Sequence, residues 1–353
     1  VRIIKYPAPK PLLNHSMASA SVVSEVMYQK YVQAVPLARQ EKTWKNMGVA
    51  FSRTTMANWV IRCSQDWLTP VWEYMHKALV QREVLHADET TVQVLKEPGK
   101  APTSKSYMWL YRTGKGEEQP IVLYDYQSGR SGEHAKAFLK GFHGYLHTDG
   151  YAGYNKVPDI TRCCCWAHLR RKFYEAMPKS GYSLANTGFD YCNQLFAVER
   201  EIEELSLQEQ REQRLRLATP IHKAFWCWLD EIASGVLGGG LKKAVEYALN
   251  QREYLENYMK DPRLSLSNNL AENSIRPFTV GRKNWMFSDT PKGAQASAVV
   301  YSLIETAKAN RVEPKCYLEF LLDTLPDLNF TQHPEKLELV MPWNEDVFQD
   351  ADD

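Results

Sequence analysis

Three carboxylates stand in positions where a solvated acid is unusual. Asp88 lies inside an apolar, β-branched stretch, Asp149 ends another such stretch, and Glu272 lies in a stretch with helical character. Burying a carboxylate in an apolar strand is costly unless it is paired or binds a cation. Brought together, the three could hold two divalent ions about 3.5–4 Å apart for in-line phosphoryl transfer, and hard oxygen ligands suit Mg²⁺ or Mn²⁺. The alternative is that each is an ordinary acid in a turn or an ion pair.

Basic residues follow the last of these acids. Arg276 comes four residues after Glu272. Arg282 and Lys283 stand in a Gly-Arg-Lys-Asn-Trp segment. Beside a phosphoryl-transfer site these side chains would bind DNA phosphates, and arginine suits this role because its planar guanidinium binds phosphate at two points. The rival role is a structural ion pair with Glu272 for Arg276 and a plain surface turn for the other two.

A second basic cluster follows a run of cysteines. Arg170, Arg171 and Lys172 have no acid between them, and they are expected either to contact DNA or to form a plain helix surface. His168 would lie near the acids as a phosphate or metal-water contact, or else pack in the core with its hydrogen bonds satisfied. The cysteines at 163–165 alternate between the faces of a predicted strand and cannot all reach one ion, so the pattern does not favour a zinc site there.

The N-terminal part of the chain is predicted to be helical and to contain a helix-turn-helix. Two helices fit the segment 39–62, with Gly48 able to end the first and Ser52 able to cap the second. The segment carries five basic residues against one acid, and the N-terminal half of a recognition helix is the part that contacts bases. The residues expected to contact DNA there are Arg53, Thr54 and Asn58. The alternative is a helical hairpin that only packs against the rest of the chain.

The middle of the chain alternates between strand and helix patterns. Strands are predicted over 84–95, 107–112, 121–126, 144–149 and 160–166, and a short helix over 131–142. Three meandering strands, a helix and two further strands is the order of a ribonuclease H-like sheet. Adjacent central strands of such a sheet would bring Asp88 and Asp149 together, and a helix packed beside them would add Glu272.

Helical patterns dominate the rest of the chain. Helices are predicted as a long block over 167–259, and then over 267–275 and 292–309. Pro277 is expected to end the second of these, so that Arg276 sits at a helix end with a free side chain. Residues 278–287 would then form a short hairpin, with Trp285 either in the core or stacked on an unpaired base.

Composition places the chain among ordinary soluble globular proteins. Its 353 residues are 44% hydrophobic and 24% charged, which is too apolar for disorder and too polar for a membrane protein. No apolar run approaches the roughly 20 residues that span a bilayer, and the first residues lack the apolar stretch of a signal peptide. The cysteine count of seven is odd and includes three adjacent residues, which fits a reducing cytoplasm better than a disulfide framework.

The net charge hides an asymmetry. Residues 323–353 hold nine acids and one lysine, a net charge of −8, so the remaining chain carries +9 within the total of +1. A basic body with an acidic tail suggests a polyanionic partner, most often nucleic acid. The alternative is a solvated acidic tail on an ordinary enzyme.

Four longer strings surround the residues singled out above. They are HisAlaAspGluThr (86–90), HisThrAspGlyTyrAlaGlyTyr (147–154), CysTrpAlaHisLeuArgArgLysPhe (165–173), and the string from AsnAsnLeuAlaGlu to AsnTrpMetPhe (268–287). Together and in this order they resemble the transposases of the insertion-sequence-66 family. The resemblance runs through most of the chain, from the ArgIleIleLysTyrPro arm to LeuValMetProTrpAsn (339–344). Members of this family usually carry a further N-terminal Cys-rich region that binds zinc, and this chain is expected to begin after it.

The resemblance implies a DDE recombinase with an α/β, ribonuclease H-like core. Asp88, Asp149 and Glu272 would be the catalytic and metal-binding triad, with two Mg²⁺ or Mn²⁺ ions as cofactors. They are 61 and 123 residues apart, and the second gap exceeds what the core needs, so 174–262 would be a helical insertion before the last acid. The activity implied is Mg²⁺-dependent cleavage at transposon ends, then attack of the freed 3′-hydroxyl on target DNA. The alternatives are a ribonuclease H-like nuclease without strand transfer and a DNA-binding protein with an inactive core.

The same resemblance implies partners and a division of the chain. The partners would be double-stranded DNA, as transposon ends and target, and further copies of the chain in a homo-oligomer, with accessory proteins left open and no membrane. The protein would work in the bacterial cytoplasm, on the nucleoid when active. The expected units are an extended arm (1–20), a helical DNA-binding unit (21–83), a catalytic core (84–173 and 263–310), the helical insertion (174–262), and a C-terminal helix with an acidic tail (311–353).

Overall fold

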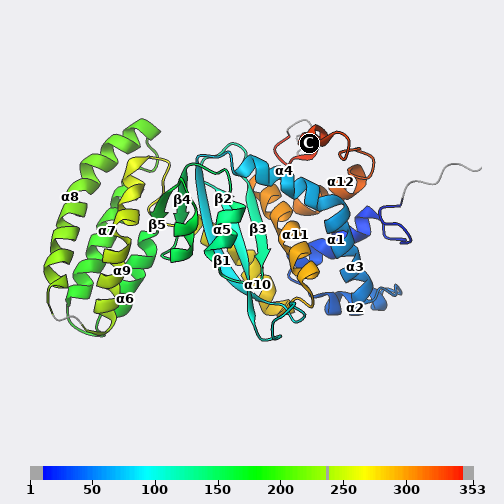
Figure 1. Ribbon diagram of the computed structural model, residues 1–353, viewed down its shortest axis with the longest axis horizontal. Coiled ribbons are helices and arrows are strands. Elements are labelled where there is room, and N and C mark those ends of the chain that lie inside the picture. Colours follow the sequence, from blue (N-terminus) through cyan, green and yellow to red (C-terminus); the bar gives the residue numbers. More distant parts are fainter. Residues whose placement is uncertain (1–10, 236–237, 345–353) are drawn as a thin grey trace, which may run out of the picture.

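A five-stranded mixed sheet lies at the centre of the computed structural model, which describes residues 11–235 and 238–344 (Figure 1). Its strands are β1 (Val84–Gln93), β2 (Lys105–Thr113), β3 (Val122–Gln127), β4 (Tyr145–Thr148) and β5 (Thr161–Cys164). They lie in the order β3-β2-β1-β4-β5. β1, β2 and β3 pair antiparallel as a meander, whereas β4 pairs parallel to both β1 and β5. The prediction of these five strands is confirmed, with ends that differ by a few residues.

Helix α11 (Pro291–Ala309) covers the edge strand β3. Its Ser302 hydroxyl accepts from the backbone N–H of Tyr124 at 2.7 Å, and its Thr306 hydroxyl accepts from the backbone N–H of Val122 at 3.0 Å. An open strand edge invites pairing with another chain. Here the side chains of a packed helix take up the hydrogen-bonding groups of that edge.

The N-terminal helices pack beside α11. They are α1 (Ala20–Tyr31), α2 (Leu37–Asn46), α3 (Arg53–Cys63) and α4 (Thr69–Leu79), with a π-helical turn at Ser64–Leu68 joining the last two. The predicted ends of the two helices around Gly48 are confirmed. Gly48 follows α2 at a φ of +82°, and the Ser52 side chain caps α3 by accepting from the backbone N–H of Thr55. At the other end of the chain, α12 (Pro314–Thr324) packs against α1, and a 3-10 turn follows at Pro334–Val340.

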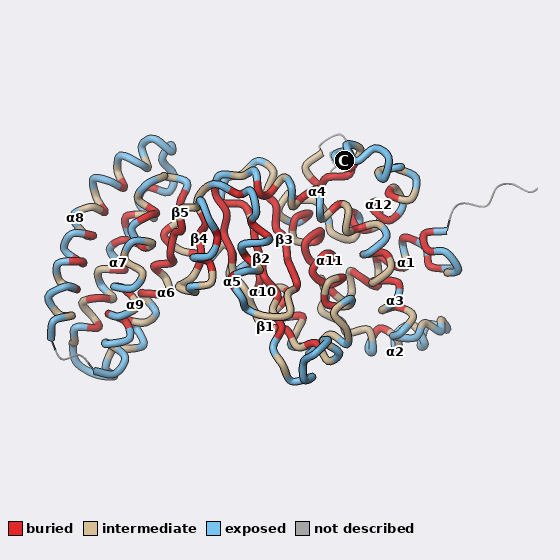
Figure 2. Tube along the Cα trace, in the orientation of Figure 1, coloured by how far each residue is buried: buried red, intermediate tan, exposed pale blue. Residues whose placement is uncertain are grey.

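Four helices beyond β5 form a second unit with its own core. They are α6 (Trp166–Ala176), α7 (Leu184–Ile202), α8 (Leu207–Ala233) and α9 (Gly239–Glu256), and a 3-10 turn at Asn257–Lys260 follows. Their buried side chains, among them Trp166, Phe173 and Phe225, cluster separately from those around β1–β3. Figure 1 shows this bundle at the opposite end of the molecule from α1–α3, and Figure 2 shows exposed residues along much of its outermost helix, α8. The molecule is therefore elongated, with the sheet between two helical regions.

Helix α10 (Asn269–Trp285) corrects two predictions, because it runs through Pro277 and through most of the segment expected to form a hairpin. The proline deprives the Asn273 carbonyl of its hydrogen bond, but Asn273 is exposed and water can replace it. Gly281, which suggested a turn, is needed for packing, since a Cβ there would lie 2.4 Å from the hydroxyl oxygen of Tyr301. Arg276 consequently lies in the middle of the helix, where the sequence predicted a helix end.

The expected N-terminal arm and acidic tail are described only in part. Residues 1–10 and 345–353 lie outside the described residues. Within the part of the arm that is described, Leu12 and Leu13 are buried, and the Leu12 carbonyl accepts from the indole N–H of Trp67 at 3.0 Å. All seven cysteines are free thiols. None of the helices among the described residues is both long and apolar enough to cross a membrane.

Candidate active site

The parallel pairing of β1 with β4 sets the first two acids side by side. His86 of β1 pairs with His147 of β4. Asp88 comes two residues after His86, and Asp149 comes two residues after His147. Side chains alternate between the faces of a strand, so His86 and Asp88 share a face of β1. Asp149 comes directly after the last residue of β4. The register therefore brings both acids to the same region, at the carboxyl end of β4.

The two histidines form a buried layer beneath the acids. The rings of His86 and His147 stack with centroids 4.9 Å apart and 5° between their planes. Burial lowers the pKa of His147 to about 4. The pKa of His86 lies well below its usual value, mainly because of burial and secondly because of the nearby His147. Nε2 of His147 donates to the carbonyl oxygen of Ser265 at 2.6 Å, and Nδ1 of His86 lies 2.9 Å from Oδ1 of Asn268. This neutral layer joins both strands to the segment that leads into α10.

Asn268 fixes the start of α10 against β1. It is 1% exposed, and its side-chain nitrogen donates to the carbonyl oxygen of Ala87 at 2.8 Å. Since the amide nitrogen is used in this way, Oδ1 must face His86, whose Nδ1 then carries the proton. Glu272 follows four residues later, one turn further along the same helix face. A single buried side chain thus ties the helix that carries Glu272 to the strand that carries Asp88.

Asp88 and Glu272 line one cavity. Its volume is about 310 Å³, and its lining residues are Asp88, His168, Asn268, Glu272, Ile275, Arg276 and Thr279. Oε1 of Glu272 is buried and accepts no hydrogen bond from any described residue. Such an oxygen, beside a second carboxylate, fits a divalent cation that prefers hard oxygen ligands. Asp149 is not part of this lining, and its Oδ1 accepts from the backbone N–H of Tyr151 at 2.9 Å.

Electrostatics nevertheless couples all three acids. Burial raises the pKa of Asp88 to about 8, with further contributions from the negative charges of Glu89, Asp149 and Glu272. A carboxyl whose ionisation is opposed by burial and by like charges is one that a bound cation would readily ionise. The donor set and its uncompensated negative charge therefore fit Mg²⁺ or Mn²⁺.

Glu89, next to Asp88, is a further carboxylate with a nearly inaccessible side chain, and the sequence alone does not separate the roles of these two neighbours. Alternation along β1 sends it to the opposite face from Asp88. Its side chain is 1% exposed, pairs with Arg130 at 2.5 Å, and accepts from the Tyr154 hydroxyl at 2.6 Å. Arg130 lies just before α5 (Gly132–Phe138), and Tyr154 lies in the 3-10 turn Ala152–Lys156. Because Glu89 already has these partners, we assign it a structural role.

Helix α6 presents a second set of side chains to Glu272. Nδ1 of His168 lies 3.7 Å from Oε1, and a guanidinium nitrogen of Arg171 lies 4.0 Å from Oε2. The ligand atoms of Cys165, His168 and Glu272 all lie within 4.8 Å of one another. A thiol and an imidazole would favour Zn²⁺. However, burial raises the pKa of the Cys165 thiol to about 12, and its sulfur accepts from the backbone N–H of Asn268 at 3.1 Å, so oxygen ligands are the better donors here.

The basic residues predicted on α10 differ in how far they are engaged. Arg276 is exposed, and its side chain lines the same cavity as Glu272. Lys283 is also exposed. Arg282 is held by β1, because its guanidinium donates to the carbonyl oxygen of Thr91. Of the three, Arg276 is therefore best placed to meet a phosphate beside the acids.

Two further candidates are half-buried and pack against other side chains of the protein. Arg170 of α6 donates to Oδ1 of Asn193 at 2.6 Å and lies 4.5 Å from the ring centre of Phe189, which fastens α6 to α7. Trp285 packs edge-on against Phe278 with ring centres 5.4 Å apart, which agrees with the core position weighed in the sequence. Arg171, by contrast, is exposed at the edge of the acid cluster.

The candidate DNA-contacting residues of α3 lie apart from the acids. Arg53, Thr54 and Asn58 are all exposed on this helix. Figure 1 shows α3 beyond α11, at the far end of the molecule from β4 and β5. The structure therefore does not bring these residues to the acid cluster, and any DNA contact there would involve another part of the duplex.

Two residues of the buried layer escaped the sequence analysis. A signal for His147 exists, since the spacing of His86 and Asp88 on one strand repeats as His147 and Asp149 on the next. Nothing local marks Asn268, because the histidine it contacts lies 182 residues away in the chain.

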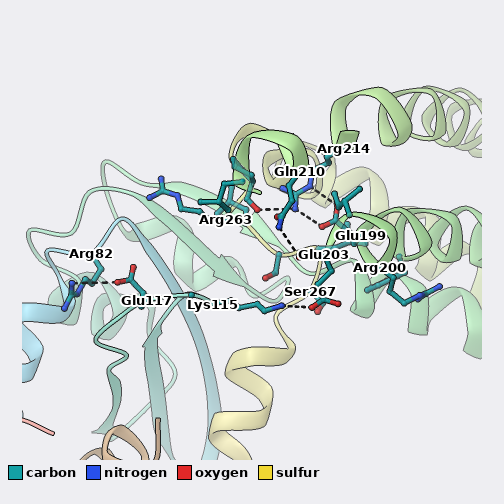
Figure 3. A pocket seen from close by; sticks show the side chains of 18 of the residues that line it. Arg82, Lys115, Glu117, Glu199, Arg200, Glu203, Gln210, Arg214, Arg263 and Ser267 are labelled. Atoms are coloured by element: carbon teal, nitrogen blue, oxygen red, sulfur yellow. Dashed lines mark hydrogen bonds and ion pairs between the residues drawn. The ribbon is translucent and has the colours of Figure 1, made fainter. Parts of the chain in front are cut away.

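Another large cavity lies elsewhere, and none of the three acids lines it (Figure 3). It has a volume of about 820 Å³ and lies between the helices α7 and α8 and the ends of β1 and β2. Its charged side chains are largely paired with one another, as Arg82 with Glu117, Lys115 with Glu203, and Arg214 with Glu199. Because these charges offset each other, the cavity presents no strong field to an anionic substrate.

Two family models match most of the chain. The model of the "Transposase IS66 family" matches residues 15–296, and that of the "IS66 C-terminal element" matches residues 302–343. The uncharacterized protein y4qI of Sinorhizobium fredii is 32% identical, and y4hP of the same organism is 29% identical, each over 97% of this chain. The chain spans 65% of the length of these two curated relatives. Since the family match covers most of its length, the chain belongs to the IS66 family of transposases.

Proposed function

We propose that this chain carries the catalytic activity of a DNA transposase, which cleaves double-stranded DNA at transposon ends and joins the freed 3′-hydroxyl to target DNA. The observation that carries the proposal is the convergence of three carboxylates from three separate elements. Asp88 comes from β1, Asp149 from the end of β4, and Glu272 from α10, and the pKa of Asp88 responds to both of the others. Family membership supports the same activity.

The core would be ribonuclease H-like. In support, an antiparallel meander of β1–β3 is followed by β4 and β5, which run parallel to β1 in the order β3-β2-β1-β4-β5. One acid lies on the central strand and the next at the end of its parallel neighbour. The division into a core (84–173 and 263–310), an insertion (174–262) and a helical DNA-binding unit (21–83) is part of this proposal.

Asp88, Asp149 and Glu272 would hold two Mg²⁺ or Mn²⁺ ions. When bound, such ions supply an activated oxygen nucleophile and stabilise the leaving oxygen of an in-line displacement. The chain's own residues prepare the site. Asp88 provides a carboxylate held with little competing hydrogen bonding, and Asn268 holds Glu272 within reach of it. His168 and Arg171 lie beside the carboxylate of Glu272 and would orient it.

DNA would run over the exposed basic residues beside the acids. Arg276 and Arg171 would bind phosphates next to the scissile bond, and Lys283 would bind further along α10. Arg170 and Arg282 are already bonded within the protein, so their contribution would be long-range positive charge. Arg53, Thr54 and Asn58 would contact a separate stretch of the duplex, in line with a recognition helix.

The test uses the purified chain with Mg²⁺ and DNA carrying the ends of its own element. We expect mapped cuts at the element's ends and, with target DNA added, joined products. The variants D88N, D149N and E272Q should abolish cleavage but leave the fold and most DNA binding intact, since each keeps shape and loses a charged ligand. E201Q, at an exposed glutamate on α7, is the matched control and should cleave like the parent.

The products decide between the candidate activities. Cuts without joined products would favour a ribonuclease H-like nuclease, and DNA binding without Mg²⁺-dependent cutting would favour a DNA-binding protein with an inactive core. Cleavage at the parental rate by any one of the three acid variants would remove that residue from the site. Omitting or adding other proteins of the element, and measuring the size of the DNA complex, would test the need for accessory proteins and a homo-oligomer.

A further inference from the structure

We propose that Arg162 is a positioning residue for Asp149, and that helix α9 of the helical insertion supplies further contacts that hold the Arg162 side chain in place. The insertion would then be part of the metal site's support, although it contributes no acid to it. This inference rests on the proposed function, since it assumes that Asp149 is a metal ligand.

Arg162 lies in β5 and fixes the turn that carries Asp149. It is 4% exposed. Its guanidinium donates to the hydroxyl of Thr148 at 3.0 Å, to the carbonyl oxygen of Asp149 at 2.7 Å, and to Oδ1 of Asn155 at 2.5 Å. The Thr148 hydroxyl in turn donates to the same Asp149 carbonyl at 2.9 Å. Both ends of the turn, from β4 to the 3-10 segment, are thus tied to one planar group.

Among the described residues, the charge of Arg162 has no carboxylate partner. No Asp or Glu oxygen in the described part of the chain forms an ion pair with it within 4.0 Å, and its hydrogen-bond acceptors are neutral oxygens. A buried charge is costly unless it is paired or fully hydrogen-bonded. The planar shape of the guanidinium explains why an arginine occupies this buried position with neutral acceptors alone, because it can donate to several oxygens in one plane at once.

Helix α9 supplies the rest of the setting. Oε1 of Gln251 accepts from Arg162 at 3.0 Å, and the ring of Tyr254 lies 4.4 Å from the guanidinium carbon. Tyr247, four residues before Gln251, faces the same turn, since a Cβ on Gly150 would lie 2.6 Å from its ring. The three α9 residues are spaced i, i+4 and i+7, which places them on one helix face.

This stripe of α9 gives the insertion a specific task. Gly150, directly after Asp149, leaves room for Tyr247, and Arg162 joins the same turn to Gln251. Loosening either contact would let the Asp149 turn shift against β1. Partners of a metal ligand that lie one step behind it commonly change metal affinity by about 10–100-fold when altered.

The test measures Mn²⁺ binding to the full chain without DNA, by electron paramagnetic resonance, together with the thermal unfolding midpoint. We expect R162K and Q251A each to raise the Mn²⁺ concentration at half-saturation by about tenfold. The matched control is R214K. Arg214, on α8, is also a buried arginine, 3% exposed, but it pairs with Glu199 and donates to the carbonyl oxygens of Tyr258, Asp261 and Pro262, none of which belongs to the Asp149 turn. R214K should lower the unfolding midpoint and leave Mn²⁺ binding unchanged.

Including D149N separates the inference from the function on which it rests. If D149N binds Mn²⁺ like the parent, Asp149 is not a ligand and the proposed function fails at that residue. If D149N loses binding while Q251A and R162K keep the parental Mn²⁺ affinity, the metal site stands and the positioning role is overturned. Should R162K not fold, Q251A alone decides, because Gln251 is only half-buried.

Discussion

Asp88 and Glu89 are neighbours on β1 with opposite environments. Glu89 is paired with Arg130 and hydrogen-bonded to Tyr154, whereas the hydrogen bond that Asp88 accepts comes from the adjacent backbone N–H of Glu89 at 2.8 Å. Because side chains alternate along a strand, Glu89 lies on the face where Arg130 and Tyr154 offset its charge, whereas Asp88 lies on the face that holds Glu272. Which acid can bind a cation is thus decided by the partners available on each face.

The raised pKa of Asp88 predicts an unusual pH dependence of stability. The folded chain keeps this proton up to a pH of about 8, whereas an unfolded aspartate releases it near its ordinary pKa of 3.8, so the metal-free protein should lose stability as pH rises between these values. D88N removes the loss and should be more stable than the parent at pH 8 by roughly 2–4 kcal/mol, with a smaller difference at pH 5. Urea unfolding at both pH values measures this. Added Mn²⁺ should stabilise the parent but not D88N, and equal stabilities at both pH values would contradict the account.

A second residue-level prediction concerns Asn268. The variant N268A leaves the His86 ring N–H and the Ala87 carbonyl without partners in the protein interior, where each such group costs about 1–3 kcal/mol. We expect the free energy of unfolding to fall by about 2–4 kcal/mol and cleavage to fall with it. N284A is the matched control, because Asn284 is exposed on the same helix and its side chain donates to the carbonyl oxygen of Val280, one turn earlier in that helix. A stability loss in N268A no larger than that in N284A would remove Asn268 from the support of the site.

At the scale of elements, capping residues and glycines predict helix ends correctly at some positions and wrongly at others. Ser52 and Gly48 mark the ends of α3 and α2 correctly, because capping and a positive φ act within a few residues. Pro277 and Gly281 wrongly suggest an end of α10. Pro277 is tolerated because the carbonyl it leaves without a hydrogen bond is exposed to water, and Gly281 is needed because Tyr301 packs closely against it. Gln251, the hydrogen-bond partner of Arg162 on α9, lies 89 residues away, so this contact has no local signature.

The two arginines of α10 should behave differently on substitution. Arg276 is exposed at the cavity, so R276A should slow DNA cleavage with little change in unfolding free energy. R276K should also slow it, because lysine binds phosphate at one point only. Arg282 is bonded to β1, so R282A should lower the free energy of unfolding by about 1–2 kcal/mol. Cleavage rates and urea unfolding of the three variants check this. A fast-cutting R276K would indicate that Arg276 only supports the structure.

At the scale of the whole molecule, one buried core surrounds β1–β3 and a second lies among the helices α6–α9, and Glu272 faces α6 near the boundary between them. The sequence predicts the triad from long strings that resemble a family, and it predicts the insertion from the gap before Glu272. It does not reveal that α9 returns to the Asp149 turn, since this depends on how four helices fold back on β5. The distance of α3 from the acids is likewise a property of the assembled fold.

That separation predicts independent effects on DNA binding and metal binding. R53A should weaken binding to the element's end by about 1–3 kcal/mol if Arg53 reads a base, or flatten the salt dependence by about one unit of slope if it binds a phosphate. Mn²⁺ binding should be unchanged. Fluorescence anisotropy at two salt concentrations measures this, with R216A on the exposed surface of α8 as control. An R53A protein that binds DNA like R216A would make α3 a scaffold helix.

The most direct measurement is a crystal structure of the chain grown with Mn²⁺, with anomalous scattering used to locate the ions. The account predicts anomalous peaks within coordination distance of carboxylate oxygens from Asp88, Asp149 and Glu272, with Asp88 ionised. Peaks bound by Cys165, His168 and Glu272, without Asp88 and Asp149, would contradict it and move the metal centre to the other side of Glu272.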